Sequence, residues 1–285
     1  MRDVPVAARP SDGSSAAVEV VEVRAGAERL PREDELAREE PLEIRIADET
    51  VAIVMRTPGA DERLALGFLL GEGIISSADD LSSIAHCGRP GTEGFGNTVN
   101  AVPAPGGKVN WDRLDRGART TVASSACGVC GRLTIDDLLV GLEPLVAAPI
   151  PASVVLAAVE GLRERQPLFE RTGGCHAVSA CAADGTPLAT HEDVGRHNAV
   201  DKVVGSLLLA RRAGDRREAA LLVISGRPGF EIVQKAARAH IPVVAGVSAP
   251  TSLAAELAKR AGITLCGFVR RGRMNVYSHP ERVAP

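Results

Sequence analysis

The sequence predicts an α/β protein in which a larger C-terminal α/β unit follows a smaller N-terminal α+β unit. In the C-terminal half, short runs of β-branched and other apolar residues alternate with stretches of helical periodicity. Strands that alternate with helices in this way imply βαβ crossovers and a mostly parallel sheet. Nearer the N-terminus, two strand-like runs and one apolar helix occur without that alternation, and the chain contains no internal repeat.

The N-terminal unit begins with a predicted hairpin. Residues 42–46 and 51–55 are rich in β-branched residues and flank a short polar turn, a pattern typical of paired strands. The following stretch, 57–61, contains Pro and Gly and ends in an acidic residue that can cap a helix. The helix contains Leu64 to Leu70 and stops at Gly71.

Composition divides the rest of the first half into a tail and a linker. Residues 1–20 mix charges with Pro, Ser and Gly, which predicts a disordered N-terminus. Residues 102–125 are again rich in Pro, Gly, Ala and Ser, which predicts a linker. The expected organisation is therefore a small α+β domain with its linker over 21–125, a mobile loop over 126–132, and the α/β domain over 133–285.

The α/β domain has a regular succession of predicted elements. Helices are expected over 135–145, 152–163, 198–212, 230–240 and 252–261, and strands over 175–182, 187–191, 220–224, 242–247 and 263–270.

Charge and hydropathy exclude several classes of protein. The formal net charge of −3 argues against a nucleic-acid binder that works by bulk electrostatics. The sequence contains no run of about 18 apolar residues, so no membrane span is expected. The first twenty residues lack the apolar core of a secretory signal. Six cysteines without such a signal favour a reducing compartment, and we expect a cytoplasmic protein.

The most reactive stretch in the sequence is a Cys-Gly-Val-Cys motif. Cys127 and Cys130 are flanked by Ser, Ala and Gly, so little side-chain bulk covers either sulfur. Two thiols at this spacing can exchange, because one can attack a disulfide or persulfide formed on the other. A helix expected just after Gly131, with Arg132 beside it, would favour the thiolate, which is the form that attacks or accepts sulfur.

Other roles for a lone CxxC are less well supported. Structural zinc needs about four ligands, and no second CxxC or paired histidine motif accompanies this one. A thioredoxin-like site would place the motif directly after a strand, whereas here it follows a linker. The remaining cysteines are isolated, and the last three lie in apparent strands, where buried packing is the usual reason for a cysteine. They are Cys87, Cys175, Cys181 and Cys266.

A polar junction at 191–202 is the first candidate binding region. It follows a strand and opens a helix, and ligands of α/β sheets usually bind at such carboxyl ends of strands. Helix capping by Asp193 would explain that residue and at most its neighbour Glu192. It would not explain Arg196, His197, Asn198, Asp201 and Lys202 together, so we favour a functional role for the group.

Two more junctions and the last strand complete the candidate surface. The stretch 225–231 places Ser, Gly and Arg227 before a helix, a combination suited to phosphate. The stretch 248–251 is explained by helix capping alone. In the last predicted strand, the alternation of side chains places Phe268 and Arg270 on one face. There the arginine could bind phosphate, and the phenylalanine ring could stack on a purine or pterin. A basic edge strand that resists aggregation is the alternative.

Taken together, these motifs resemble the formate dehydrogenase accessory sulfurtransferase family, FdhD. The resemblance runs from about residue 38 to about residue 283. It rests on Ser-Ser-Ala-Cys127-Gly-Val-Cys130-Gly, Glu192-Asp193-Val-Gly-Arg196-His197-Asn198, Ser225-Gly-Arg227-Pro-Gly-Phe230 and Phe268-Val-Arg270-Arg-Gly-Arg273.

The resemblance implies a function and a set of partners. Members accept sulfur from a cysteine desulfurase as a persulfide and pass it to the bis(molybdopterin guanine dinucleotide) molybdenum cofactor, which formate dehydrogenase requires. The cofactor is then a bound substrate, and no permanently bound metal is expected. The partners implied are the desulfurase, the catalytic subunit of formate dehydrogenase and a second copy of the chain in a homodimer, with no nucleic acid and no membrane.

By position, the resemblance makes Cys127 the persulfide carrier and Cys130 its assistant or relay. The implied cofactor-binding residues are Phe268, Val269, Arg270, Arg271, Gly272 and Arg273, joined by Arg196, His197 and Arg227. The family also implies a cytidine-deaminase-like C-terminal domain. The zinc motifs of deaminases, H-x-E and P-C-x-x-C, are absent from the corresponding junctions, so deamination is not expected.

Two other functions stay open from the residues alone. A pure cofactor chaperone would use the cysteines only to grip the donor enzyme. A thiol–disulfide oxidoreductase would instead form a stable, reducible Cys127–Cys130 bond.

Overall fold

The computed structural model describes residues 13–26, 29–88, 96–113 and 143–285. The loop predicted over 126–132, with Cys127 and Cys130, lies outside these described residues. So does most of the helix predicted over 135–145, and the described residues 143–145 are not helical.

The N-terminal unit is a four-stranded sheet with one main helix. The strand order is β4-β3-β6-β5, in which β3 pairs antiparallel with β4 and parallel with β6. The predicted hairpin is confirmed, and its turn at Ala47 and Asp48 has positive φ at both residues, as in the tight turns that match strand twist. The elements are β3 (Glu40–Ile46), β4 (Glu49–Arg56), α1 (Asp61–Gly71), η1 (Ala78–Asp80), β5 (Leu81–His86) and β6 (Thr98–Pro103).

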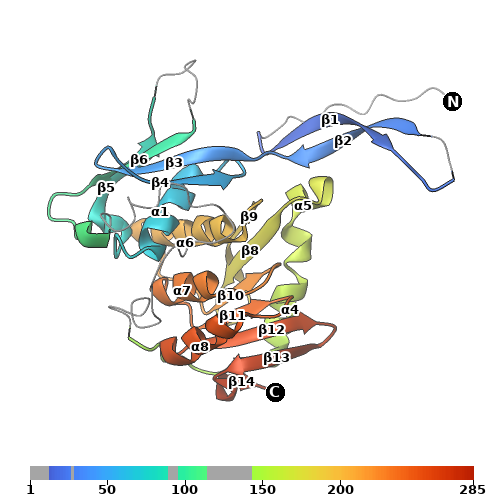
Figure 1. Ribbon diagram of the computed structural model, residues 1–285. Helices are drawn as coiled ribbons and strands as arrows, with labels where there is room; N and C mark the ends of the chain where they lie inside the picture. The colour runs from blue at the N-terminus through green and yellow to red at the C-terminus, as the bar shows by residue number, and fades with distance from the viewer. Residues whose placement is uncertain (1–12, 27–28, 89–95, 114–142) are drawn as a thin grey trace.

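A two-stranded arm precedes this sheet. The strands β1 (Ser15–Glu22) and β2 (Leu30–Ala37) pair antiparallel and project from the body of the protein (Figure 1). The prediction of a disordered N-terminus over 1–20 is therefore wrong for residues 15–20. The three valines of β1 supply strand propensity. The root of the arm is fixed by an ion pair between Arg171 and Glu35 (3.0 Å).

The C-terminal unit is built on a six-stranded sheet in the order β13-β12-β11-β10-β8-β9. Only the β10–β11 and β11–β12 pairs are parallel, so the expected mostly parallel sheet is in fact mixed. At the two edges, β8 and β9 and likewise β12 and β13 are joined by short turns. These pairs are antiparallel because a short turn cannot make the crossover that parallel strands need. The strands are β8 (His176–Cys181), β9 (Pro187–Asp193), β10 (Leu221–Ile224), β11 (Val243–Gly246), β12 (Thr264–Arg270) and β13 (Arg273–Ser278).

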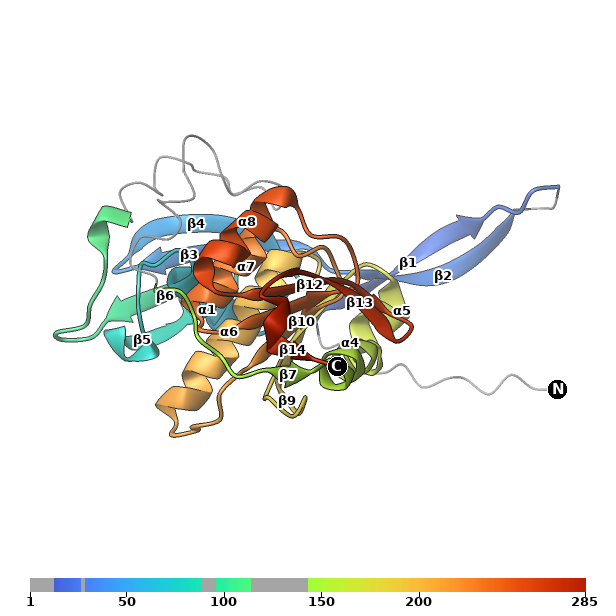
Figure 2. The same cartoon turned by 90° about the horizontal axis from the view of Figure 1, so that it is seen from below.

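Helices cover both faces of this sheet. Figure 2 shows α6, α7 and α8 on one side and α4 on the other, and two separate apolar clusters fill the two interfaces. The helices are α4 (Ala152–Glu160), α5 (Pro167–Thr172), α6 (Arg196–Arg212), α7 (Phe230–Arg238) and α8 (Ser252–Ala261), with short turns η2 (Arg163–Arg165) and η3 (Pro280–Arg282). A small parallel pair, β7 (Ile150–Pro151) and β14 (Val283–Ala284), closes the chain.

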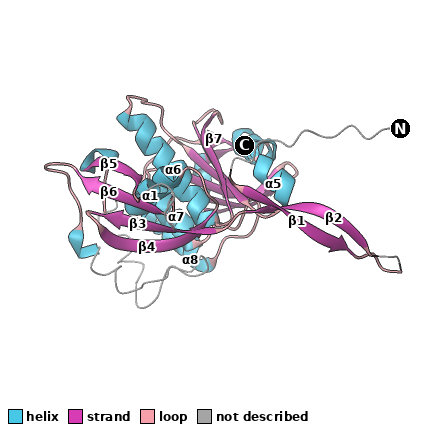
Figure 3. Ribbon diagram, turned by 90° about the horizontal axis from the view of Figure 1, so that it is seen from above, coloured by secondary structure: helices cyan, strands magenta, loops and turns pink. Residues whose placement is uncertain are grey.

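The two units share one core. Seen from above, the four-stranded sheet lies over α1 and α6 (Figure 3), and the same apolar cluster runs from Leu42 to Leu265. Gly67 and Gly205 let the two helices touch through their backbones: a Cβ on either glycine would overlap a carbonyl group of the facing helix. The candidate site is thus carried by one continuous body. No helix in the described ranges has the length and apolar character needed to cross a membrane.

Candidate functional site

The carboxyl ends of four strands meet at one edge of the six-stranded sheet. The strands β9, β10, β11 and β12 run in the same direction, and β8 begins at this edge with His176. Ligands of open α/β sheets usually bind at such an edge. The junctions predicted from the sequence at 191–202 and 225–231 both open onto it, as does the turn between β12 and β13 around residues 268–273.

Arg196 is the first residue of α6 and packs against the end of β10. A Cβ on Gly226 would lie 3.6 Å from the Arg196 Cδ and 3.3 Å from the His176 Nδ1, so residues from α6, β8 and β10 come together here. Arg196 Nε is buried without a hydrogen bond, and the side chain has no carboxylate partner in the described ranges. The guanidinium is therefore available for an anion.

His197 joins the first turns of α6 and α7. Its Nδ1 lies 3.0 Å from Oε2 of Glu231. Burial, followed by the charges of Arg196 and Lys235, lowers the pKa of His197 to about 3. The ring is neutral at neutral pH, so Nδ1–H donates to the carboxylate in an ordinary hydrogen bond. His197 positions the two helix starts, and its imidazole is not free to contact a ligand through Nδ1.

Arg227 and the turn between β12 and β13 present the remaining arginines. Arg227 is exposed between β10 and α7. Arg270, Arg271 and Arg273 are also exposed, and none of these four forms an ion pair with another described residue. Val269, by contrast, is buried in the core, so it supports the turn from beneath.

Phe268 has an unusual backbone. Its φ is 52° at an irregularity in the β12–β13 pairing between Gly267 and Arg270. A bulky residue with positive φ is a genuine outlier, and such strain gathers at ligand sites. The residue is 36% exposed, and the Arg270 guanidinium lies 5.9 Å from the ring centroid. The predicted pairing of an aromatic face with arginine is therefore present.

The structure corrects the reading of the other polar residues at 191–202. Asp193 is fully buried and forms a 2.7 Å ion pair with Lys202. Lys202 also donates to the Thr57 carbonyl oxygen (2.7 Å), and Asn198 donates to the Met55 carbonyl oxygen (2.7 Å) and to Asp193 (3.0 Å). Asn198 and Lys202 therefore join the N-terminal unit to α6, and they do not form part of a ligand surface.

Asp201 has a similar structural role. It forms a buried pair with Lys235 of α7 at 2.7 and 3.0 Å. Burial opposes the charge of Lys235, but the adjacent carboxylate outweighs it and raises the pKa of the lysine. Burial raises the pKa of Asp201 to about 7 against the charge of that lysine, and the hydrogen-bonded pair links α6 to α7. We call the buried groups around Asp193, Asn198, Asp201, Lys202 and Lys235 the seam.

Three of the four described cysteines are buried and unreactive, as the sequence predicted. Burial raises the pKa of Cys175 to about 11 and that of Cys266 to about 12, and it raises the pKa of Cys181 as well. All three are thiols at neutral pH. Cys87 is partly exposed, with its Sγ 3.8 Å from the Thr98 carbonyl oxygen. Within the described ranges, no three His, Cys, Asp or Glu side chains gather as metal ligands.

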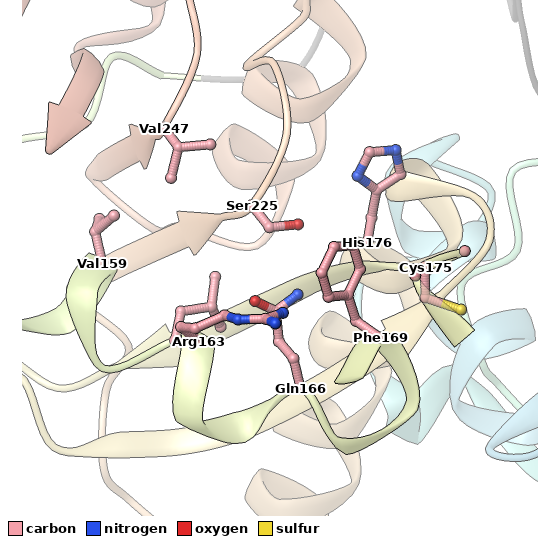
Figure 4. A pocket seen from close by; sticks show the side chains of 11 residues that line it. Val159, Arg163, Gln166, Phe169, Cys175, His176, Ser225 and Val247 are labelled. Atoms are coloured by element: carbon pink, nitrogen blue, oxygen red, sulfur yellow. The ribbon is translucent and has the colours of Figure 1, made fainter. Parts of the chain in front are cut away.

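A cavity of about 480 Å³ opens beside His176 at the same edge. It lies between the η2–α5 segment and the ends of β10 and β11, and its polar side chains are shown in Figure 4. One wall is formed by Arg163, Gln166 and Phe169, which no sequence pattern had pointed to. The available signal was the phenylalanine itself, since aromatic residues make up only 2% of the chain.

Comparisons with known proteins agree with this arrangement. The model of the FdhD/NarQ family matches residues 37–284. Sulfur carrier protein FdhD of Anaeromyxobacter dehalogenans strain 2CP-C is 57% identical over 255 residues, which cover 88% of each chain. Sulfur carrier protein FdhD of Streptomyces coelicolor is 44% identical over 271 residues, covering 93% of this chain and 94% of that one.

A solved structure shows the same fold. The crystal structure of a protein from Desulfotalea psychrophila, described as a formate dehydrogenase accessory protein, superposes with a TM-score of 0.75. It covers 95% of this chain and 100% of its own, at 28% identity. The family match spans both units and every described part of the edge. The chain therefore belongs to the FdhD/NarQ family.

Proposed function

We propose that this protein is a sulfur carrier that works through a persulfide. Cys127 accepts sulfur from a cysteine desulfurase, and the sulfur passes to the bis(molybdopterin guanine dinucleotide) molybdenum cofactor that formate dehydrogenase requires. The relatives from Anaeromyxobacter and Streptomyces carry the name sulfur carrier protein, and the similar solved structure is described as a formate dehydrogenase accessory protein.

The observation that carries the proposal is the set of arginines at the carboxyl edge. Arg196, Arg227, Arg270 and Arg273 have no carboxylate partner among the described residues, and Phe268 is held in a strained conformation beside them. Guanidinium groups bind phosphate through paired hydrogen bonds, and an exposed ring can stack on a heterocycle. A dinucleotide cofactor offers both kinds of group.

The state of the cysteines supports Cys127 as the carrier by exclusion. A carrier must be a thiolate that a second protein can reach. Cys175, Cys181 and Cys266 are buried and protonated at neutral pH, so they meet neither requirement. Cys87 is partly exposed but stands alone in the sequence, outside the Cys-Gly-Val-Cys motif, so we assign the carrier role to Cys127 and the assisting role to Cys130.

The transfer can be written with balanced atoms and electrons. The Cys127 thiolate attacks the outer sulfur of the donor's cysteine persulfide; a new S–S bond forms on Cys127, and the donor leaves as a thiolate. Attack of Cys130 on the inner sulfur then forms the Cys127–Cys130 disulfide and releases the outer sulfur as sulfide, the form that a metal takes as a ligand. The two electrons come from the two thiols, so an external dithiol reductant has to reduce the disulfide by thiol–disulfide exchange before the next cycle.

Further features belong to the same proposal. The central parallel strands β10–β12, with helices on both faces, are consistent with a cytidine-deaminase-like layout reused as a cofactor cradle. We also propose that the carrier acts as a cytoplasmic homodimer. Function then resides in the site rather than in the fold, as is usual for widely used folds.

Mass spectrometry after incubation with a desulfurase and cysteine tests the carrier step. We expect a one-sulfur adduct on Cys130→Ala, a smaller amount of it on wild type, where Cys130 can release the sulfur, and none on Cys127→Ala. In cells that lack their own copy, Cys127→Ala should fail to restore formate dehydrogenase activity. Active formate dehydrogenase with Cys127→Ala, or an absent adduct with full activity, would support a pure cofactor chaperone instead. Turnover of unrelated disulfide substrates would support an oxidoreductase.

A further inference from the structure

The two-stranded arm of β1 and β2 is supported by the rest of the described chain only at its root. There Arg171 pairs with Glu35, and a Cβ on Gly174 would lie 3.3 Å from the Cβ of Ala37. Beyond the root both strands project away from the body (Figure 1 and Figure 2). A hairpin of two strands is marginally stable in water on its own, and three or more strands are needed for independent stability. The distal half of the arm therefore calls for a further strand.

The arm also exposes apolar side chains as a group. Of the ten large apolar side chains that are exposed in the described ranges, four lie on the arm or its turn. Val21 is 57% exposed and Val23 is 66% exposed, and Leu30 and Leu36 are each 50% exposed. Single exposed apolar residues are ordinary, whereas a group of them marks an interaction surface.

The two outer edges of the arm differ in their protection against further pairing. The strand β2 contains Pro31 and four charged residues in succession, 32–35, and proline and charge are the usual means of blocking an edge strand. The strand β1 has no proline, lysine or arginine, and five of its eight residues are alanine or valine. Because the arm is a sheet of two strands, β1 pairs with no third strand in the described ranges. The open edge is that of β1.

The register shows which backbone groups of β1 point to this open edge. Val21 lies opposite Pro31, which has no N–H to donate, and the Ser14 carbonyl oxygen accepts a hydrogen bond from Arg38 N–H (2.8 Å). Hydrogen-bonded and non-hydrogen-bonded pairs alternate along antiparallel strands. The even-numbered residues of β1 therefore bond to β2. The odd-numbered residues, Val21 among them, direct their N–H and C=O groups outward.

Charge changes along the arm from acidic near the root to basic near the tip. Glu19 and Glu33 lie directly opposite each other, and neither forms an ion pair with a described residue. Like charges in such positions are destabilising. The described charges beyond Glu22 are the exposed Arg24 and Arg29. Two arms that run antiparallel would bring the basic tip of each toward the acidic root of the other, so the arm is complementary to itself in charge.

We propose that the β1 edge pairs with the β1 edge of a second copy of this chain. The two arms run antiparallel about a twofold axis and form a four-stranded sheet in the order β2-β1-β1-β2. This sheet has the number of strands that a lone hairpin lacks. The bodies of the two copies then lie at opposite ends of the joined arms. The inference rests on the proposed function only for the homodimer, whose surface it names.

Charge selects the register of this pairing. A twofold axis at either glutamate of β1 would place two identical carboxylates directly opposite each other, and an axis at Val20 would bring a glutamate of the partner toward Asp34. An axis at Val21 places two exposed valines together at the centre. It also sets the partner's Arg24 opposite Val18, which lies opposite Asp34 of its own β2. The partner's Arg24 and Asp34 then attract each other across Val18.

Val21→Pro tests the pairing, because it removes an N–H that points to the open edge and leaves the bonds to β2 intact. Sedimentation velocity of the full-length protein over a range of concentrations should show a wild-type dimer. Val21→Pro should raise the dissociation constant of the dimer at least about tenfold, since two backbone hydrogen bonds are lost. Glu33→Pro is the matched control, because its N–H points to the outer edge of β2, and it should dimerise as wild type does. Circular dichroism checks that both variants keep the fold.

A charge exchange tests the register independently of proline. Each dimer contains the contact between Arg24 and Asp34 twice, so Arg24→Glu should raise the dissociation constant about tenfold. Adding Asp34→Arg should restore the wild-type value, because the attraction crosses from one copy to the other. If the double variant stays as weak as Arg24→Glu, the axis is not at Val21.

The outcomes separate this surface from the rest of the proposed function. A dimer that Val21→Pro and Arg24→Glu both leave unchanged overturns the arm pairing and assigns the homodimer to another surface. A wild type that stays monomeric refutes the pairing and the homodimer together. Neither result depends on sulfur loading of Cys127, which mass spectrometry reports separately.

Discussion

The seam and the carboxyl edge contain the same kinds of residue in opposite states. In the seam, Lys202 and Lys235 each have a carboxylate within 2.7 Å and almost no exposure. At the edge, Arg227 and Arg273 are exposed and have no carboxylate partner among the described residues. The stretch 191–202 contributes to both regions, because Arg196 lies at the edge and Lys202 lies in the seam. Paired and buried charge holds the body together, whereas unpaired charge beside a cavity is free to bind.

The largest difference between the regions should appear in stability. Lys202→Met leaves Asp193 charged and buried without its partner, and breaking a buried pair in this way costs about 3–5 kcal/mol. Urea denaturation followed by circular dichroism measures the loss. Arg212→Met removes an exposed partner of Asp79 and should leave the midpoint nearly unchanged, since surface pairs contribute little. A loss below about 1 kcal/mol for Lys202→Met would place the seam in the same class as the surface.

His197 lies between the two regions and should give stability a pH dependence. Its pKa in the folded protein, about 3, is below the ordinary value of 6.5. Between these values the unfolded chain binds more protons, so stability is complete above pH 6.5 and falls as the pH decreases toward 3, by up to about 1.4 kcal/mol per pH unit. His197→Gln should flatten the profile of urea midpoints between pH 4.5 and 7. An equally steep profile in the variant would assign the dependence to other groups, such as His191, whose pKa is lowered to about 4 by burial.

The smallest effect on stability is expected at the edge, together with a clear effect on binding. Arg273→Ala should leave the urea midpoint unchanged and weaken GDP about tenfold, the amount expected when one charge-assisted contact is lost. Isothermal titration at two salt concentrations measures both the affinity and its salt dependence. Arg217→Ala, which removes another exposed arginine, is the control and should bind GDP normally. If both variants bind alike, Arg273 belongs with the ordinary surface.

The sequence predicted local elements well because their causes are local. The 42–46 and 51–55 strands, the α1 helix and the alternation of Phe268 and Arg270 all follow from patterns within a few residues. The division of 191–202 into edge and seam could not be predicted from local patterns. It depends on contacts such as the hydrogen bond from the Thr57 backbone N–H to Asp193, which lies 136 positions away in the sequence. The cavity beside His176 was missed for the same reason, since its walls come from segments far apart in the chain. The roles of Cys127 and Cys130 stay predictions.

The glycines at the crossing of α1 and α6 have a consequence for assembly. A methyl group at Gly67 or Gly205 would strike the backbone of the opposite helix. Sliding one helix along the other would bring a residue with a Cβ to this contact, so the register of the two helices is fixed. The four-stranded sheet that lies over α1 and the arginine that begins α6 are thereby held in one fixed relative orientation.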